Sequence, residues 1–254
     1  MDTAWRATIS TFTILPAGHA GEIEPRTWRR MVLWLPVLGA VLGVAAAAVQ
    51  FAVGRAGHSD RLLAAVLGIA TVGLLTGGLH LDGLADTADA LASRRPADEA
   101  LAIMRRSDIG PMGVAALLFV ALAQVSALAA LPAGWPAAAA LITAVVTSRV
   151  TVVLASGLPA ARPDGFGTHV AASTTRPARI AVLAAWLAVV GAGAAAAGGT
   201  ALALRGLLAV LAGLLAAALV AWAARARLGG MTGDVFGALI EICTAGVLVV
   251  LAST

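Results

Sequence analysis

The sequence predicts an all-α integral membrane protein, a polytopic bundle of about seven transmembrane helices in a single membrane domain, 1–254. The first observation is composition: 60% of the residues are hydrophobic and 12% are charged, whereas soluble globular domains carry about 25% charged residues. This composition excludes a disordered chain, a nucleic-acid partner and most soluble enzymes. The other two observations are the length of the apolar stretches and the placement of the arginines.

A helix needs about 20 apolar residues to cross the hydrocarbon core of a membrane. Seven stretches meet or approach this length: 31–53, 62–79, 112–131, 137–157, 180–198, 206–223 and 235–251. The first begins too late, and runs too long, for a cleaved signal peptide. We expect 1–30 to lie in the cytoplasm or at the membrane interface and 31–251 to form the bundle. The short joins 132–136 and 199–205 predict that the helices they connect are antiparallel neighbours.

Orientation follows from the basic residues, all 17 of which are arginine. With the N-terminus inside, 13 arginines lie in inner segments, three lie in outer segments, and Arg149 lies within a span. Cytoplasmic loops carry an excess of basic residues, so this distribution predicts an inner N-terminus and an outer C-terminus. Most acidic residues fall on the same inner side, which topology does not require because acids contribute little to orientation.

The segment 76–90 carries three aspartates, Asp82, Asp86 and Asp89, at the inner end of the second span. Their spacing places them on one face of a helix, where the carboxylates repel each other unless a cation lies between them. Mg²⁺ prefers carboxylate oxygens and completes its shell with water and substrate phosphate. We therefore expect a Mg²⁺ site, and a solvated helix face is the alternative. Gly83 and its small neighbours leave room for another helix or a substrate.

His80 lies two residues before Asp82, about 160° around the helix. It is a candidate catalytic residue together with Asp82 and Asp86, as a general base or a ligand. The alternative is a histidine that faces the membrane interface.

A second acidic segment opens the last span. Asp234 is a candidate fourth metal ligand, and capping of the helix by Thr232 or Asp234 is the alternative. Glu241 follows on the same face, about 10 Å deeper in the membrane. A carboxylate at that depth needs a partner, and Arg149 is the expected one. This ion pair would hold the fourth and seventh spans together.

Clustered cations follow the acidic helix. Arginines beside aspartates suit metal-assisted phosphoryl transfer, because guanidinium groups and metals neutralise phosphate oxygens as charge moves to the leaving group. Part of the cluster is explained by topology alone. The expected substrate-binding residues are Arg94, Arg95, Arg105, Arg106, Ser107, Arg149, Arg162 and Gly165. The last two belong to a glycine-containing loop, a plausible substrate clamp.

Three stretches, TGGLHLDGLADTADAL (76–91), IMRRSDIGPMG (103–113) and LGGMTGDVFGALIE (228–241), resemble the signature blocks of the cobalamin synthase family. FTILP (12–16), TSR (147–149) and ARPDGFG (161–167) are similar to further family landmarks in the expected order. The resemblance implies an Mg²⁺-dependent enzyme of the cell inner membrane with its active site on the cytoplasmic face. It would join adenosylcobinamide-GDP to α-ribazole, or to α-ribazole 5′-phosphate, and release GMP. A homo-oligomer remains open.

One departure from the family pattern is that the acid and the base are exchanged about Ser107, giving Arg106 and Asp108. A salt-bridge pair that tolerates exchange explains this better than a metal-ligand role for Asp108. Two alternatives to the enzyme are a multi-pass transporter with a cytoplasmic-side cation site and a non-catalytic membrane subunit. Transporters place ionisable residues near the midplane and often in repeated halves, whereas these acids gather on one side.

Overall fold

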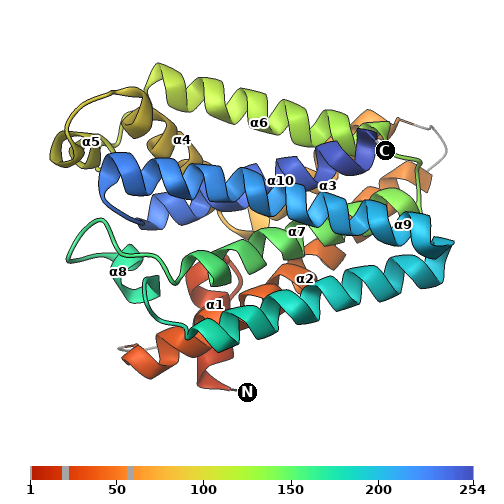
Figure 1. The fold of residues 1–254 in the computed structure, drawn as a ribbon. Coiled ribbons are helices and arrows are strands. Elements are labelled where there is room, and N and C mark those ends of the chain that lie inside the picture. The colour runs from red at the N-terminus through yellow and green to blue at the C-terminus, as the bar shows by residue number, and fades with distance from the viewer. Residues whose placement is uncertain (1, 19–22, 56–59, 254) are drawn as a thin grey trace.

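The computed structural model describes residues 2–18, 23–55 and 60–253, and the chain is a bundle of α-helices (Figure 1). These residues form no strand, and one isolated bridge joins Ala160 to Met231. The helices are α1 (Thr3–Phe12), α2 (Pro25–Arg55), α3 (Arg61–Leu75), α4 (Leu79–Ala92), α5 (Ala97–Ile103), α6 (Pro111–Ala130), α7 (Trp135–Ala155), α8 (Phe166–Val170), α9 (Arg176–Leu228) and α10 (Gly233–Ser253). The all-α prediction is confirmed.

The C-terminal helix α10 organises the bundle. It packs against α4, α6, α7 and α9, and it is buried along most of its length. The helices α6 and α7 contact each other much less than either contacts α10. The helices that the short join connects are thus in contact, as expected of neighbours, but each packs more extensively against α10.

Glycines let these helices approach closely. A Cβ on Gly39 of α2 would lie 3.1 Å from the carbonyl oxygen of Val145 on α7. One on Gly213 of α9 would lie 2.9 Å from the carbonyl oxygen of Cys243 on α10. Helices in a membrane associate through such close packing, since lipid chains are as apolar as leucine side chains.

The helix α9 is a hairpin rather than one rod. The backbone leaves helical geometry at Gly198 and Gly199, and Gly199 has a φ of +75°, a conformation that glycine adopts without strain. A Cβ on Gly206 would lie 3.1 Å from Cγ1 of Val190, so residues on either side of the break pack together. The two halves are antiparallel, as expected, but the predicted join 199–205 is helical and the turn is shorter.

The helices α3 and α4 meet at a bend of 90°. The predicted span 62–79 thus ends at Leu75, and the acidic helix α4 turns away instead of continuing it. Gly77 and Gly78 form the corner with φ values of +61° and +74°. The N-terminal segment braces this corner, because the Ile14 amide donates to the Leu75 carbonyl oxygen at 2.9 Å.

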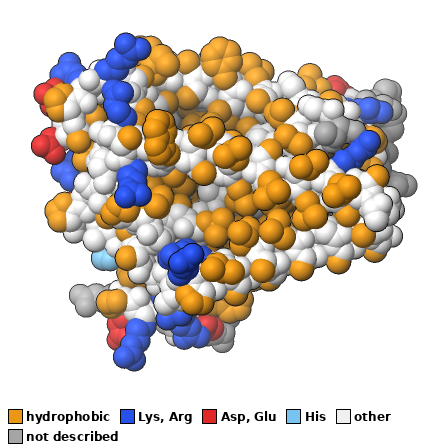
Figure 2. Space-filling view, in the orientation of Figure 1, with side chains coloured by type: hydrophobic (Ala, Val, Ile, Leu, Met, Phe, Trp, Pro, Cys, Tyr) orange, Lys and Arg blue, Asp and Glu red, His pale blue; other side chains and the backbone are white. Residues whose placement is uncertain are grey.

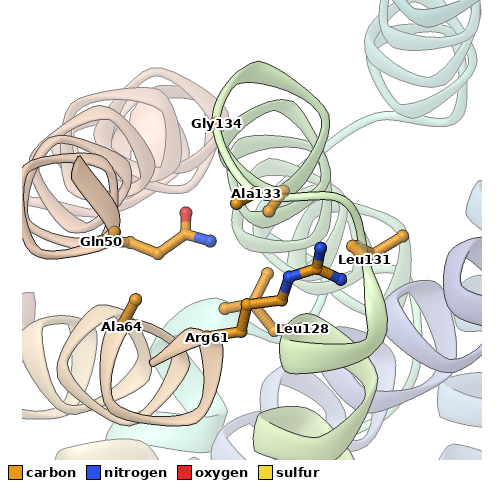
Figure 3. Close-up of a pocket in the computed structure, with 9 residues that line it drawn as sticks. Gln50, Arg61, Ala64, Leu128, Leu131, Ala133 and Gly134 are labelled. Atoms are coloured by element: carbon orange, nitrogen blue, oxygen red, sulfur yellow. The ribbon is translucent and has the colours of Figure 1, made fainter. Parts of the chain in front are cut away.

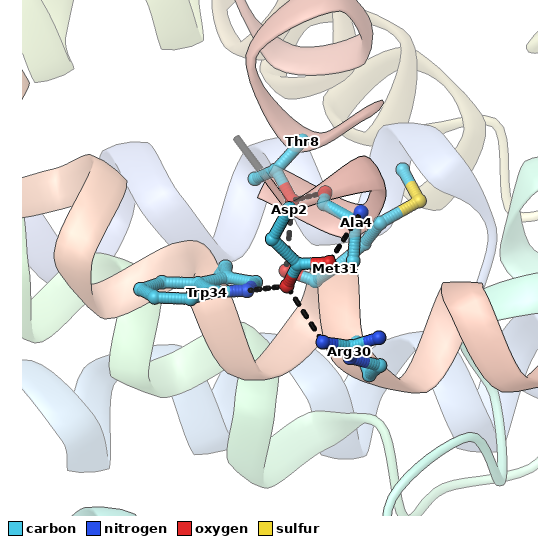
Figure 4. Close-up of polar contacts among 6 residues, drawn as sticks. All are labelled: Asp2, Ala4, Thr8, Arg30, Met31 and Trp34. Atoms are coloured by element: carbon cyan, nitrogen blue, oxygen red, sulfur yellow. Dashed lines mark hydrogen bonds and ion pairs between the residues drawn. The ribbon is translucent and has the colours of Figure 1, made fainter. Parts of the chain in front are cut away.

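The N-terminal helix α1 is anchored on α2 (Figure 4). Asp2 accepts from the Ala4 amide at 3.3 Å, which caps α1, and its Oδ2 pairs with Nη2 of Arg30 at 2.7 Å. Trp34 Nε1 donates to the same oxygen at 3.3 Å. The Asp2 carboxylate therefore caps the N-terminus of α1 and joins this helix to α2.

Five helices are long and apolar enough to cross a membrane, and the bent pair α3–α4 makes a sixth if it is one broken span. The hairpin in α9 divides one of the five into two antiparallel helices. Figure 2 shows charged side chains gathered towards the ends of the molecule with apolar surface between them. The chain is thus a polytopic helical membrane protein. The count of seven and the inner N-terminus stay predictions.

Candidate active site

Glycine contacts hold the two acidic segments together. A Cβ on Gly83 of α4 would lie 2.6 Å from the carbonyl oxygen of Asp234, at the start of α10. One on Gly237, a turn later in α10, would lie 3.2 Å from Cα of His80. The two helices therefore meet backbone to backbone, which brings Asp234 beside the carboxylate face of α4.

The carboxylates of this cluster repel each other. Asp82 is exposed, and Asp86 and Asp234 are half-buried. Asp86 lies in α4, outside the apolar span of α3. Burial raises its pKa to about 6, and the charges of Asp82, Asp234 and Asp89 contribute to the increase. Among the described residues, no arginine forms an ion pair with Asp82, Asp86 or Asp234. The cluster thus has an excess of negative charge that a cation would relieve.

Asp89 has a role that the sequence did not reveal. Its Oδ2 accepts from the Gly110 amide at 2.7 Å, and its Oδ1 accepts from the Gly113 amide at 2.9 Å. The carboxylate thus satisfies free amides at the N-terminus of α6, where the helix dipole favours a negative charge. Each oxygen keeps acceptor capacity, but the geometry ties Asp89 to α6 rather than to the open face of the cluster.

The carboxylate oxygens of the cluster suit a hard divalent cation, but they are not placed to enclose one by themselves. Within the described ranges, no three His, Cys, Asp or Glu side chains are placed to hold a metal ion together. Asp82, Asp86 and Asp234 supply carboxylate oxygens, which Mg²⁺ prefers, and Mg²⁺ usually takes part of its shell from water and substrate phosphate. The residues therefore fit a metal that binds with its substrate rather than in a closed protein cage.

The helix N-cap of α10 is Thr232, one of the two expected alternatives. Its Oγ1 accepts from the Val235 amide at 3.2 Å and donates to Oδ2 of Asp234 at 3.2 Å. Asp234 is thus oriented by the cap and remains a candidate ligand.

The arginines between α4 and α6 in the chain lie on exposed segments. Arg95 pairs with Glu99 at 2.9 Å, and Arg105 lies 3.7 Å from Asp164. Arg94 and Arg106 are exposed, and neither has an ion pair with a described residue. Ser107 and Asp108 are exposed as well. Asp108 forms no salt bridge in the described part of the chain, so the pair suggested by the exchanged residues is not formed.

Arg162 connects the loop after α7 to the acidic end of the bundle. Its Nη2 donates to the Leu101 carbonyl oxygen at 2.6 Å. Burial lowers the pKa of its guanidinium, the charge of Arg105 lowers it further, and Asp234 and Asp164 oppose the shift. Arg162 is therefore within electrostatic reach of Asp234. Gly165, three residues on, is exposed with a φ of +95° and precedes α8.

Arg149 and Glu241 are buried but do not form the predicted ion pair. Nη1 of Arg149 donates to Oγ of Ser148 at 2.9 Å, and Oε2 of Glu241 accepts from Nε2 of Gln124 at 2.9 Å. The prediction that they join the fourth and seventh spans is wrong, because Gln124 on α6 takes the carboxylate instead. Arg149 also lies deeper than the exposed arginines with which it was grouped.

His80 is enclosed between α4 and α10. It is 5% exposed, and its Nδ1 is buried without a hydrogen-bond partner among the described residues. It therefore does not share the open face of Asp82. The role of His80 in proton transfer stays a prediction.

A small cavity of about 130 Å³ lies at the opposite end, between the ends of α2, α3, α6 and α7 (Figure 3). Gln50 and Arg61 are among its lining residues, and no described acidic residue lines it. Among the described residues, the clustered carboxylates that a metal needs thus lie at the α4 end.

Sequence reasoning missed Gln124 and Ile14 as individual residues. Gln124 is an amide inside an apolar span, and that signal is readable because polar groups in membrane helices need partners. Ile14 carried no such signal, since its contribution is a backbone hydrogen bond to a segment far away in the sequence.

Fold and site together define a multi-pass membrane protein that presents carboxylates and guanidinium groups at one end of its bundle. The chain belongs to the cobalamin-5-phosphate synthase family, whose sequence model matches residues 4–252. A relative from Frankia casuarinae, named adenosylcobinamide-GDP ribazoletransferase, is 38% identical over 98% of this chain and 94% of its own length. Relatives of the same name from Nocardioides sp. (35% identical, covering 100% of both chains) and Bradyrhizobium diazoefficiens (38%, covering 98% and 92%) also match. No solved structure matches the chain.

Proposed function

We propose that this protein is an adenosylcobinamide-GDP ribazoletransferase that joins adenosylcobinamide-GDP to α-ribazole, or to its 5′-phosphate, and releases GMP. The full-length match to relatives of that name supports the activity. The convergence of Asp82, Asp86 and Asp234 at one end of the bundle is the observation that carries the location of the site. A transporter would not require these acids to gather at the end of the bundle that also carries exposed arginines.

The proposed chemistry is a displacement at phosphorus. A ribose hydroxyl of the ribazole attacks the phosphate attached to cobinamide, the bond to the GMP phosphate breaks, and the hydroxyl proton passes to a base. Mg²⁺, held by Asp82, Asp86 and Asp234, would neutralise charge on the pyrophosphate. Arg94, Arg106 and Arg162 offset the remaining charge at the phosphate oxygens. Asp89 keeps α6 in place against α4.

The proton acceptor that we propose is His80, through its free Nδ1. The hydroxyl must then approach from inside the bundle, because the His80 side chain is buried. A His80→Gln variant should lose kcat by about 10²-fold or more if the imidazole accepts the proton. A purely structural role would lower the melting temperature and leave kcat of the folded fraction unchanged.

We further propose that the active site faces the cytoplasm from the cell inner membrane. Most of the arginines, 13 of 17, lie in the segment before α2 and its first turns, between α4 and α6, from the loop after α7 to the start of α9, and at the end of α9. Cytoplasmic loops carry such an excess of basic residues.

The activity is tested by incubating the purified full-length protein in lipid nanodiscs with adenosylcobinamide-GDP and α-ribazole. Release of GMP, together with one equivalent of the joined corrinoid, is expected with Mg²⁺ and should stop with EDTA. Unchanged turnover in EDTA would contradict the metal, and absence of GMP under all conditions would contradict the reaction. Parallel reactions with α-ribazole 5′-phosphate determine which acceptor is preferred.

A further inference from the structure

A cavity of about 600 Å³ lies at the bend between α3 and α4. Residues of α3, α4, α6, α7 and α10 line it, together with Ile14. Most of the lining side chains are apolar, and the polar ones include Gln124, Arg149 and Glu241. Small-molecule sites are commonly apolar pockets of about 300–1,000 Å³ with a few convergent polar groups. The size and lining therefore fit a small organic ligand rather than a whole corrinoid.

The polar groups of this cavity are incompletely satisfied. Arg149 is 2% exposed, its Nη1 is used by Ser148, and its Nη2 is buried with no hydrogen-bond partner in the described chain. A buried charged donor without an acceptor is costly. Arg149 lines the cavity, and its Nη2 has almost no accessible surface, so a ligand there supplies the missing acceptor once the guanidinium turns towards the cavity.

Glu241 limits which ligand that can be. Its carboxylate lines the same cavity, and Gln124 donates to only one of its oxygens, Oε2. A guanidinium and a carboxylate that line one cavity disfavour both an anion and a cation, since each is repelled by one of them. A neutral heteroaromatic group that accepts from Arg149 meets both conditions.

The cavity also adjoins the acidic cluster. Gly77, Gly78 and Leu81 line it, and Leu81 immediately precedes Asp82. A nucleoside whose base fills the cavity would thus place its sugar towards the carboxylates of α4.

The geometry points to this cavity as the subsite for the dimethylbenzimidazole base of α-ribazole, an inference that rests on the proposed function. The base is a neutral, apolar double ring. The ring nitrogen that is not bonded to ribose accepts a hydrogen bond from Nη2 of Arg149. The ribose hydroxyls lie at the α4 end of the cavity, inside the bundle, and point towards the phosphate of the nucleotide-linked corrinoid.

The direct test is equilibrium binding of 5,6-dimethylbenzimidazole and of α-ribazole to the full-length protein in nanodiscs, measured by calorimetry. We expect both to bind, and Arg149→Gln to weaken each by at least about tenfold, the loss of one hydrogen bond to a charged group. Because a buried arginine can be needed for folding, Ala121→Trp is the second variant: Ala121 lines the cavity, and an indole there would fill it. Leu122→Trp is the matched control, since Leu122 is 59% exposed and does not line the cavity.

Kinetics separate this inference from the proposed function. If the protein releases GMP, Ala121→Trp should raise KM for α-ribazole at least about tenfold and leave KM for adenosylcobinamide-GDP unchanged. If Ala121→Trp is active and its KM values for both substrates are unchanged, the subsite is overturned while the proposed activity stands. Base binding that Ala121→Trp abolishes, in a protein that releases no GMP, would keep the subsite and reject the activity. No base binding, with lipid retained in the cavity, would identify a lipid-filled cavity and overturn the inference.

Discussion

At the scale of single residues, the cluster of α4 and α10 combines two kinds of aspartate. Asp82, Asp86 and Asp234 repel one another and form no ion pair with an arginine among the described residues, whereas Asp89 is held by two amides of α6. The same residue type at helical spacing thus divides into groups available to a ligand and a group that stabilises the fold.

We expect Asp82→Asn and Asp86→Asn each to lower kcat by at least about 10²-fold, as loss of preorganised charge at a reacting phosphate does. Neither change should lower the melting temperature, and both should raise it, because each removes repulsion between like charges. GMP release and thermal unfolding in detergent check the two effects. Asp98→Asn, at an exposed position of α5, is the control and should change neither. Full turnover in both variants would reject the carboxylate cluster as a metal site.

Asp89→Ala should have the opposite signature. It leaves the Gly110 and Gly113 amides without their acceptor, which costs about 1–3 kcal/mol for a buried donor. The melting temperature of Asp89→Ala should fall, and that of Asp89→Asn, which keeps one acceptor oxygen, should fall by less. A variant as stable as the unaltered protein would show that the α6 amides find water instead.

At the scale of elements, the site depends on how closely α4 and α10 approach. A methyl group on Gly83 would meet the backbone of Asp234, which cannot move aside as a flexible side chain can. Gly83→Ala should therefore destabilise the protein by about 1–3 kcal/mol, as overpacking does, and lower activity by displacing Asp234. Gly193→Ala in α9 is the matched control, since a Cβ there has open space, and alanine improves helix propensity. The comparison is measured by thermal unfolding and GMP release; equal behaviour would contradict the close contact.

The bend between α3 and α4 is the second decisive feature at this scale. It turns the acidic helix away from the span that precedes it and opens the 600 Å³ cavity at the corner. Gly77 and Gly78 adopt positive φ values there, which the paired glycines of the sequence allow.

At the scale of the whole molecule, the predicted orientation places α5 inside and the C-terminus outside. The described cysteine, Cys243, is buried, so cysteines introduced at exposed positions dominate labelling by an impermeant thiol reagent. We expect Asp98→Cys to react in inverted vesicles only and Ser253→Cys to react in right-side-out vesicles only. The reverse pattern would overturn the inner N-terminus, and labelling of both from one side would overturn an odd number of crossings.

Much of this architecture was readable from the sequence, because a bilayer imposes long apolar helices on any chain that crosses it. The apolar spans within α2, α6, α7 and α10, a reversal of the chain near residue 199 and the gathering of acids with arginines follow from local composition. The capping role of Asp89, the partner of Glu241 and the brace from Ile14 did not follow from it. Each joins segments far apart in the chain, and spacing within one helix carries no information about such pairs.

The sequence by itself determined that this is a helical membrane protein, which family it resembles and which residue types carry the chemistry. The tertiary structure alone decided which carboxylates remain available, since α6 engages Asp89 while Gly83 admits Asp234. It also separated Arg149 from Glu241 and placed both in a cavity instead of an ion pair. The physical reason is that a buried polar group must find a partner, and which partner is within reach depends on how the helices pack, not on their order.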